Sequence, residues 1–204
     1  MAKYAVLVID MMKNLVYGYP VFEDRFVKII DPINRVLDAA HAHGIPVIFS
    51  NISFRKVAGG YDDGGILNML DIQNEQLGIP GKIPRAALEM GAEGLEIIDE
   101  LHVVDGDYIL RKNRYSAFYG GDLETLLKEL GVDTLIVVGI VTNICVRATC
   151  LDAFQKGWNT IVPRECVQTY SDRAQEQGLE DLMFTTSELV SVNDLVERIA
   201  DTTV

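Results

Sequence analysis

The chain has 204 residues, of which 49% are hydrophobic and 24% are charged, and its formal net charge is −12. These values are typical of one well-cored globular domain spanning residues 1–204, and they argue against a disordered chain. No apolar run reaches the length of a membrane span, so no membrane partner is expected. Because nucleic-acid binding needs clustered Lys and Arg, the acidic balance also argues against a nucleic-acid partner.

The first expected element is a strand at residues 4–9, a short apolar run that ends at Asp10. It lacks the small-residue cleavage site of a signal peptide, so we interpret it as part of the fold. The three cysteines show no paired spacing, which suits a reducing compartment better than a disulfide framework. We therefore expect a cytoplasmic protein.

A helical pattern follows over residues 23–43, where apolar side chains recur at helical spacing. Pro32 interrupts this pattern and predicts a helix start or a kink near it. Gly44 suits the position just after the helix, and residues 45–49 form the second expected strand.

Regularity breaks down between residues 51 and 94, a stretch rich in Gly, Asp and Pro. A connection this long inside a compact domain is usually functional or disordered. Its apolar residues, such as Ile66 and Leu70, predict that it packs against something. We interpret an insertion at about residues 54–94 as a lid or a contact between subunits.

Helices and strands alternate along the remaining chain. The expected helices are residues 95–101, 123–130, 174–185 and 193–200, the last capped by Asn193, and the expected strands are residues 108–110, 135–138, 159–162 and 188–191, the last at a sheet edge. Such alternation predicts a three-layer α/β/α, Rossmann-like fold with a six-stranded, mostly parallel sheet.

Cys145 opens a helical pattern directly after the strand at residues 135–138 and Gly139, with Asn143 as the expected helix cap. A thiol in the first turn of a helix feels the positive end of the helix dipole, which favours a nucleophilic thiolate. The alternative is a small buried hydrophobic residue, the usual state of a free cysteine. Cys150 and Cys166 lack this context and are interpreted as structural.

Two further residues follow strands of the same sheet, Asp10 and Lys112. The carboxyl ends of parallel strands share one edge, so both are expected near Cys145. A carboxylate can take the proton of an attacking thiol and return it to a leaving amine, while an ammonium favours the anionic forms. Each residue alone could be an ordinary turn or solvated side chain.

Four segments resemble the isochorismatase-like cysteine hydrolases, in the right order across most of the chain: VLVIDMM, GAEGLEIIDEL, LRKNRYSAFYGGDL and VVGIVTNICVRATCLDA. The resemblance implies a catalytic triad of Asp10, Lys112 and Cys145. It also implies a cis peptide between Ile140 and Val141, an oxyanion hole from the amides of Val141 and Cys145, and a homodimer or homotetramer.

The resemblance also bears on the reaction. Members that cleave the vinyl ether of isochorismate typically lack the nucleophilic cysteine, so Cys145 favours amide hydrolysis. Nicotinamidases carry an Asp-x-His metal motif after the second strand, where this chain has Asn51-Ile52-Ser53. The histidines, His41, His43 and His102, lack ligand spacing, so no metal and no cofactor is expected.

The remaining branch hydrolyses N-carbamoyl and ureido compounds, and its Asp-Arg segment is similar to Asp172-Arg173. The planar fork of an arginine suits a substrate carboxylate, although a solvated arginine at a helix start is an equal alternative. The resemblance adds Phe118 and Thr142 as substrate contacts. We expect a hydrolase that releases ammonia from a small N-carbamoyl, ureido or carboxamide compound through a thioester. The alternatives are a nicotinamidase-type or isochorismatase-type enzyme, or an inactive binding module.

Overall fold

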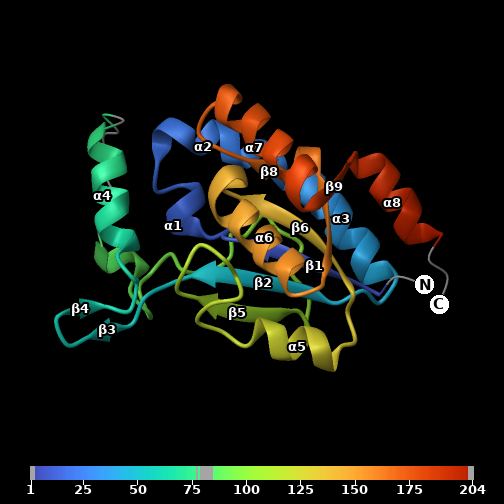
Figure 1. Cartoon of the computed structure of the whole chain (residues 1–204), viewed down its shortest axis with the longest axis horizontal. Coiled ribbons are helices and arrows are strands. Elements are labelled where there is room, and N and C mark those ends of the chain that lie inside the picture. Colours follow the sequence, from blue (N-terminus) through green and yellow to red (C-terminus); the bar gives the residue numbers. More distant parts are fainter. Residues whose placement is uncertain (1–2, 77, 79–84, 202–204) are drawn as a thin grey trace.

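The computed structural model describes residues 3–76, 78 and 85–201. A parallel sheet forms its centre, with the strand order β5-β2-β1-β6-β7-β9 and a short β8 beside β6 (Figure 1). The strands are β1 (Tyr4–Ile9), β2 (Val47–Ile52), β5 (Tyr108–Lys112), β6 (Thr134–Ile140), β7 (Asn159–Pro163), β8 (Val167–Gln168) and β9 (Ser187–Val190). The expected α/β class is confirmed, and the two-residue β8 makes a seventh strand where six were expected.

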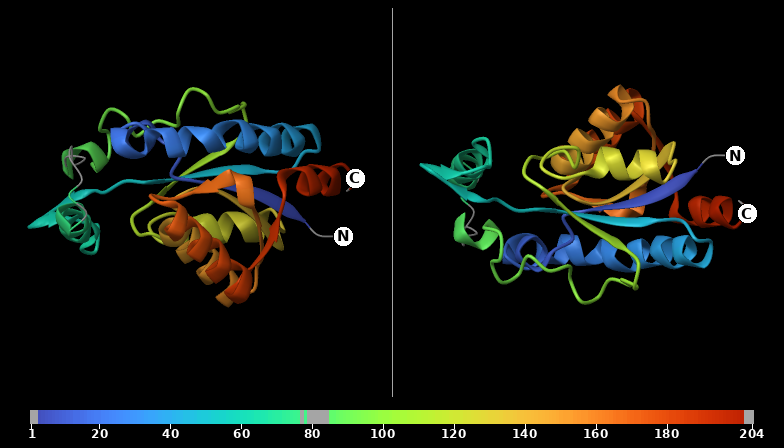
Figure 2. Two further views of the ribbon diagram at one scale, coloured as in Figure 1. Left: turned by 90° about the horizontal axis from the view of Figure 1, so that it is seen from above. Right: turned by 90° about the horizontal axis from the view of Figure 1, so that it is seen from below.

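Helices cover both faces of the sheet (Figure 2). One face carries α3 (Ile30–Ala42) and α8 (Val192–Ala200), and the other carries α5 (Leu123–Glu129), α6 (Arg147–Gln155) and α7 (Asp172–Thr185). Because side chains alternate along a strand, Val6 and Val8 of β1 join the first core while Leu7 and Ile9 join the second. None of the described helices is long and apolar enough to cross a membrane.

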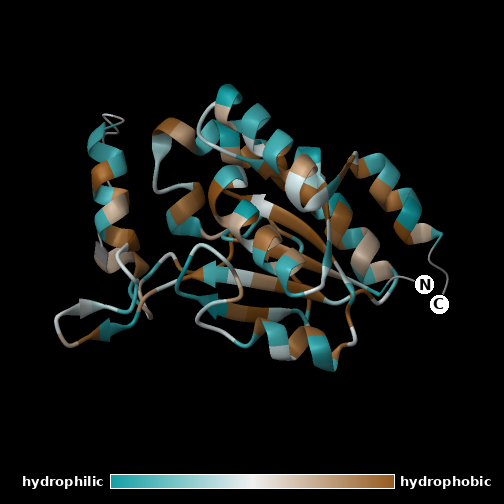
Figure 3. Cartoon of the chain, viewed as in Figure 1, coloured by the Kyte–Doolittle hydropathy of each residue, from teal (hydrophilic) through white to brown (hydrophobic). Residues whose placement is uncertain are grey.

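Hydropathy colouring shows the same layering, with apolar strands in the centre and polar outer faces on the helices (Figure 3). Every residue of β6 is buried, as expected for a strand covered on both faces. The strands of the centre were therefore predictable from their continuous apolar runs.

The helical pattern at residues 23–43 divides into several pieces. After α1 (Lys13–Val16) come α2 (Pro20–Phe26), a 3₁₀ turn (Val27–Ile29) and α3. Pro32 lies in the first turn of α3, where its missing N–H has no intrahelical partner to lose. The expected helix start near Pro32 is confirmed, and Gly44 follows α3 with a φ of +64°.

Residues 95–101 do not form the expected helix. Their backbone instead pairs with the chain after β1: the Lys13 N–H donates to the Glu96 carbonyl at 3.1 Å, and the Ile98 N–H donates to the Met11 carbonyl at 3.2 Å. These hydrogen bonds between distant segments replace the intrahelical bonds that the apolar spacing predicted.

The cap of α8 also differs from the expectation. The helix begins at Val192, and the hydroxyl of Ser191 accepts a hydrogen bond from the Asp194 N–H at 3.1 Å. Asn193, the expected cap, lies inside the helix and accepts a hydrogen bond from Arg35 at 2.7 Å. Two polar residues near the helix start made the exact cap ambiguous in the sequence.

The expected insertion at residues 54–94 contains regular structure. A hairpin of β3 (Lys56–Val57) and β4 (Gly60–Tyr61) leads into α4 (Ile66–Gln76), and a 3₁₀ turn (Arg85–Leu88) follows. We call residues 55–76 the arm. It projects beyond the carboxyl end of β2, with α4 standing apart from the sheet (Figure 1). Residues 77 and 79–84 of the insertion lie outside the described part of the chain.

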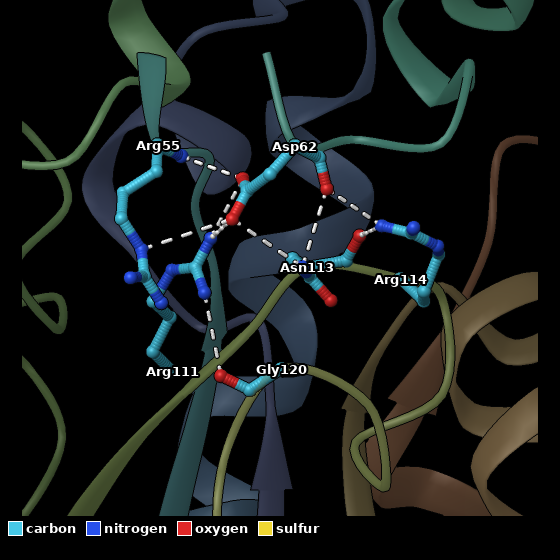
Figure 4. Close-up of polar contacts among 6 residues, drawn as sticks. All are labelled: Arg55, Asp62, Arg111, Asn113, Arg114 and Gly120. Carbon is cyan, nitrogen blue, oxygen red and sulfur yellow. Dashed lines mark hydrogen bonds and ion pairs between the residues drawn. The ribbon is translucent and has the colours of Figure 1, made fainter. Parts of the chain in front are cut away.

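Asp62 holds the arm to the end of β5 and to the residues that follow it (Figure 4). Its carboxylate accepts hydrogen bonds from the Arg55 N–H at 2.6 Å and from Arg111 Nη2 at 2.8 Å to each oxygen. Its carbonyl accepts from Arg114 Nη1 at 2.7 Å and Asn113 Nδ2 at 3.2 Å. These contacts tie the arm to the residues on both sides of Lys112.

The ionisation of Asp62 strengthens this attachment. Burial acts to raise the pKa of the carboxyl, but the hydrogen bonds from the Arg55 N–H and Arg111, together with the Arg111 charge, outweigh it and lower the pKa. A lowered folded-state pKa means that the contribution to stability is present at neutral pH and is lost as the pH falls through that pKa.

Candidate active site

Three side chains from three strand ends meet at the carboxyl edge of the sheet. Asp10 follows β1, Lys112 ends β5, and Cys145 lies in a π-helical segment, Thr142–Val146, after β6. Lys112 Nζ lies 2.7 Å from Asp10 Oδ2, and both side chains are buried. The Cys145 thiol interacts with both of these groups. The structure therefore brings together the three residues singled out in the sequence.

The backbone fixes the Asp10 carboxylate. β2 lies between β1 and β5, and its Ile52 N–H donates a hydrogen bond to Asp10 Oδ1 at 2.8 Å. Asp10 has a φ of +56°, in the left-handed region that aspartate tolerates better than most residues. Apart from the Lys112 ion pair, Oδ2 has no hydrogen-bond donor among the described residues. This oxygen is therefore placed to accept a proton.

Lys112 is fully buried, yet it remains a cation. Burial acts to lower the pKa of its ammonium, but the charge of Asp10, together with the interaction with the Cys145 side chain, outweighs burial and raises the pKa. The ammonium also donates a hydrogen bond to the Arg114 carbonyl at 3.2 Å. The site thus holds a fixed positive charge beside the thiol and the carboxylate.

Cys145 is 6% exposed, and burial raises the pKa of its thiol to about 12. The Lys112 charge acts to lower this pKa and the Asp10 charge acts to raise it. The resting form at neutral pH is therefore the thiol, whereas the sequence predicted a thiolate favoured by a helix dipole. The difference arises because burial penalises the anion more than the nearby ammonium stabilises it.

The end of β6 brings Cys145 close to Asp10. Gly139 has a φ of +111°, and a Cβ there would collide with the Ile9 carbonyl oxygen, so glycine permits the close approach of β6 to β1. The peptide bond between Ile140 and Val141 is cis, as the resemblance implied. The expected cap Asn143 lies within the π-helical segment, where its side chain accepts a hydrogen bond from Thr169 at 2.7 Å.

Thr149 holds the backbone at Cys145 from the following helix. Its hydroxyl donates to the Cys145 carbonyl at 2.7 Å and accepts from the Ala117 N–H at 3.0 Å. Thr149 is fully buried, so both hydrogen bonds are shielded from water. This bridge connects the π-helical segment that contains Cys145 to the loop after Lys112.

A narrow cavity of about 50 Å³ opens onto Asp10 and Cys145. Its walls come from the segments that follow β1 and β6, the ends of β2 and β6, the arm, the 3₁₀ turn after the arm, the loop after β5 and the loop before α7. Besides Asp10 and Cys145, the lining residues are Leu15, Tyr19, Phe26, Ile52, Ile66, Leu70, Leu88, Tyr115, Ile140, Val141, Ile144 and Tyr170. The cavity is therefore mostly apolar, with three tyrosines.

The three expected substrate contacts lie outside this lining. The Phe118 ring packs against Trp158 with their centroids 5.6 Å apart. Thr142 is fully buried and donates a hydrogen bond to Gln175 Oε1 at 2.7 Å. Arg173 is exposed in the first turn of α7. These three residues therefore do not line the cavity, although Thr142 shares the π-helical segment with Cys145.

The described residues contain no cluster of three or more His, Cys, Asp or Glu side chains that could hold a metal ion. Each histidine has its own partner: His41 lies 3.0 Å from Asp107, His102 lies 2.8 Å from Asp38, and His43 lies 2.8 Å from the Ala39 carbonyl. All three lie outside the cavity lining.

Sequence reasoning did not identify the cavity tyrosines. Tyr115 lies three residues after Lys112, and Tyr170 directly precedes the Ser171-Asp172-Arg173 segment. Tyr170 packs against Phe22 and Phe26, with ring centroids 4.7 and 6.0 Å apart. Their proximity to motif residues was a signal, but an aromatic residue beside a motif is more often part of a core.

The arm contributes Ile66 and Leu70 to the cavity wall, so its attachment should affect substrate binding. We expect Asp62→Ala to raise KM by roughly tenfold. Hydrogen bonds to charged groups contribute about 1.5–3 kcal/mol each, and without the Asp62 carboxylate part of the free energy that holds the arm against the cavity is lost. The rate of Cys145 alkylation without substrate should change little. Steady-state kinetics would check this, with exposed Glu75 on α4 changed to alanine as the matched control. Equal KM values for both variants would contradict it.

Comparison with known proteins supports the assignment of this site to a family. Residues 4–194 match the isochorismatase domain. A cysteine hydrolase from Pseudomonas syringae pv. phaseolicola 1448A has a similar structure, with a TM-score of 0.80, 27% identity, and 98% of this chain and 93% of that chain covered.

The relatives with named activities include two amidohydrolases. The N-carbamoylsarcosine amidase of Arthrobacter is 30% identical over 88% of this chain and 64% of its own length. The maleamate amidohydrolase of Pseudomonas putida KT2440 is 28% identical over 97% of this chain and 87% of its own length. The domain match covers nearly the whole chain, and it coincides with the segments that carry Asp10, Lys112 and Cys145. The chain belongs to the isochorismatase family.

Proposed function

We propose that this protein is a cysteine-dependent amidohydrolase that cleaves the C–N bond of a small, non-peptide amide and releases ammonia. The observation that carries the proposal is the buried contact among Asp10, Lys112 and Cys145 at the mouth of a small cavity. A nucleophile, a proton acceptor and a cation in contact are what acyl transfer through a thiol needs. The amidohydrolases among the relatives support the same reaction class.

In the first half-reaction, Asp10 Oδ2 takes the proton of the Cys145 thiol as the sulfur attacks the amide carbon. The carbonyl becomes a tetrahedral oxyanion, which we place against the backbone N–H groups of Val141 and Cys145. Asp10 then gives its proton to the nitrogen, the C–N bond breaks, and ammonia leaves. The acyl group remains on sulfur as a thioester.

In the second half-reaction, water replaces ammonia as the partner of Asp10. The carboxylate takes a proton from the water, whose oxygen attacks the thioester carbon, and the C–S bond breaks. The proton returns to sulfur, and the carboxylic acid leaves. Lys112 stays protonated throughout, because its raised pKa keeps the ammonium charged beside the changing anions.

A screen for ammonia release tests this function directly. N-carbamoyl compounds, ureido acids and carboxamides should include substrates that the wild type hydrolyses, and Asp10→Asn should abolish the release because an amide side chain cannot accept the proton. Ammonia release that persists in Asp10→Asn, or no release from any class, would refute the proposal.

We expect this activity to be independent of a metal ion. The proposed steps use a side-chain nucleophile and a side-chain base, so neither a metal-bound water nor a Lewis acid takes part. Activity should survive exhaustive treatment with EDTA. Loss of activity that zinc or another divalent ion restores would contradict the expectation and favour a nicotinamidase-type site.

We also propose that the protein assembles as a homodimer or homotetramer through the arm. Met69 and Ile72 on α4 are each 47% exposed, and α4 stands away from the sheet (Figure 1). Light scattering at micromolar concentration should give a multiple of the 22.6 kDa chain mass. A stable monomer mass would contradict this, and the arm would then serve the cavity alone.

A further inference from the structure

We infer that the acyl part of the substrate is small, apolar and uncharged, so that carboxamides with a hydrocarbon acyl group are preferred over amides that carry a second carboxylate. This inference rests on the proposed amide hydrolysis and narrows its substrate class. It departs from the expectation that Arg173 would bind a substrate carboxylate.

The first support is the character of the cavity wall. No Lys, Arg or His among the described residues lines the cavity, and most of its lining is aliphatic or aromatic. The arm contributes Ile66 and Leu70, α2 contributes Phe26, and the π-helical segment contributes Ile144. A carboxylate placed there would lose its hydration and gain no cation, which makes its burial costly.

The buried cation beside the cavity, Lys112, already has protein partners for its ammonium group. The Lys112 ammonium lies 2.7 Å from Asp10 Oδ2 and donates a hydrogen bond to the Arg114 carbonyl. It also interacts with the Cys145 thiol. A substrate carboxylate that took over Lys112 would remove the counterion of the proposed base, so binding in that mode would impair the reaction.

Two arginines beside the arm, Arg111 and Arg114, also have protein partners. Arg111 donates to both Asp62 oxygens at 2.8 Å and to the Gly120 carbonyl at 3.3 Å. Arg114 donates to the carbonyls of Asp62 and Asn113 at 2.7 and 2.6 Å (Figure 4). Both guanidinium groups therefore serve the attachment of the arm.

Arg25 of α2 also has its guanidinium occupied by protein partners. Its guanidinium donates to the Thr169 carbonyl at 2.8 Å and to Asp172 at 2.7 Å. These contacts hold the segment around Tyr170, which lines the cavity. Arg25 thus supports the wall without lining it.

The polar groups that do line the cavity beyond the triad are phenols. Burial is the main cause that raises the pKa of both Tyr115 and Tyr170, so each keeps its O–H at neutral pH. No hydrogen bond from either hydroxyl to another described residue is observed. A neutral hydroxyl can orient an amide or another uncharged polar group, but it cannot neutralise a carboxylate.

A matched pair of amides tests the inference. 4-Methylpentanamide and succinamate have the same reacting group and the same two-carbon spacer, but one ends in an isopropyl group and the other in a carboxylate of similar shape. We expect kcat/KM to be about 100-fold higher for 4-methylpentanamide, because the cavity offers the carboxylate no partner. Higher or equal kcat/KM for succinamate would overturn the inference while leaving the proposed amide hydrolysis intact.

A readout without turnover separates the two proposals. Each amide is added before Cys145 is alkylated with iodoacetamide, and labelling is followed by mass spectrometry. 4-Methylpentanamide should protect Cys145 at concentrations where succinamate does not. Equal protection by both amides, or none by 4-methylpentanamide, would overturn the inference. If 4-methylpentanamide protects Cys145 but no amide releases ammonia, the preference of the cavity for an apolar acyl group would be supported and the proposed hydrolysis would be refuted.

A cation placed in the wall gives the reverse test. Leu70→Arg adds a guanidinium at a lining position of α4, which gives the carboxylate of succinamate a partner. The ratio of kcat/KM for 4-methylpentanamide to kcat/KM for succinamate should therefore fall at least about tenfold. The matched control is Gln76→Arg, at an exposed position of the same helix that does not line the cavity. It should keep the wild-type preference. The same preference in both variants would count against the inference.

Discussion

Replacing Cys145 by alanine is expected to lower kcat by 10⁴-fold or more, on the order found when the nucleophile of a covalent hydrolase is removed. Without the sulfur no thioester forms, and the remaining groups can only activate water weakly. The fold should survive, because the change removes a single atom from a wall that already borders a cavity. Ammonia release measures the loss, and thermal unfolding checks the fold.

Cys150→Ala is the matched control for this result. Cys150 is a fully buried thiol in α6 whose pKa burial also raises to about 12, but it does not line the cavity. Its alanine variant should keep nearly wild-type turnover. Cys145→Ser should also be very slow, since an alcohol is a far weaker nucleophile beside the same base. Wild-type hydrolysis by Cys145→Ala would show that the covalent mechanism is wrong.

Lys112→Ala is expected to have the second-largest effect, through electrostatics. The ammonium acts to lower the pKa of the Cys145 thiol and balances the charge of Asp10. Without it, a carboxylate and a developing thiolate face each other, and like charges oppose ionisation. The pH profile of Cys145 alkylation should shift to higher pH, and turnover should fall by about 10²–10³-fold.

The same variant should also be less stable. Removing one partner of a buried ion pair leaves an uncompensated charge and typically costs about 3–5 kcal/mol. Lys112→Arg keeps the charge but misplaces it, because the guanidinium is wider and planar, so its rescue should be partial. The matched control is Lys128→Ala, at a half-exposed i,i+4 pair with Glu124 on α5. If the pH profile of Cys145 alkylation in Lys112→Ala overlays that of the wild type, Lys112 has a structural role only and the proposed triad is wrong.

The framework of this site was predictable from the sequence because its parts follow local rules. Asp10, Lys112 and Cys145 each lie at or shortly after the end of a predicted strand, and parallel strands bring their carboxyl ends to one edge. That reasoning placed Asp10, Lys112 and Cys145 at a common edge without any knowledge of loop conformations. The oxyanion hole at Val141 and Cys145 stays a prediction.

The cavity was not predictable because it depends on contacts between distant segments. Leu70 reaches it through the arm, whose position is fixed by Asp62 and the arginines around β5. Tyr170 reaches it from the loop before α7, while Arg173, three residues later, points away into solvent as an exposed side chain. Which of two nearby residues faces a site depends on loop geometry that a motif does not specify.

The protonation state of Cys145 could not be predicted from the sequence either. A helix dipole can be anticipated from the position of a residue in a predicted helix, but the extent of burial cannot. The thiol is 6% exposed, and burial outweighs the Lys112 charge in setting its pKa. The protein therefore holds a protonated thiol at rest, and proton transfer to Asp10 becomes part of the proposed reaction.

The most direct test of the account is to trap the acyl-enzyme. Wild-type enzyme is mixed with 4-methylpentanamide, quenched in acid during turnover and digested, and the peptides are analysed by mass spectrometry. We expect a 4-methylpentanoyl group on the peptide that contains Cys145, and no such group after Asp10→Asn or Cys145→Ala. Steady ammonia release with no acyl group on Cys145 at any quench time, or with the acyl group on another residue, would contradict the account.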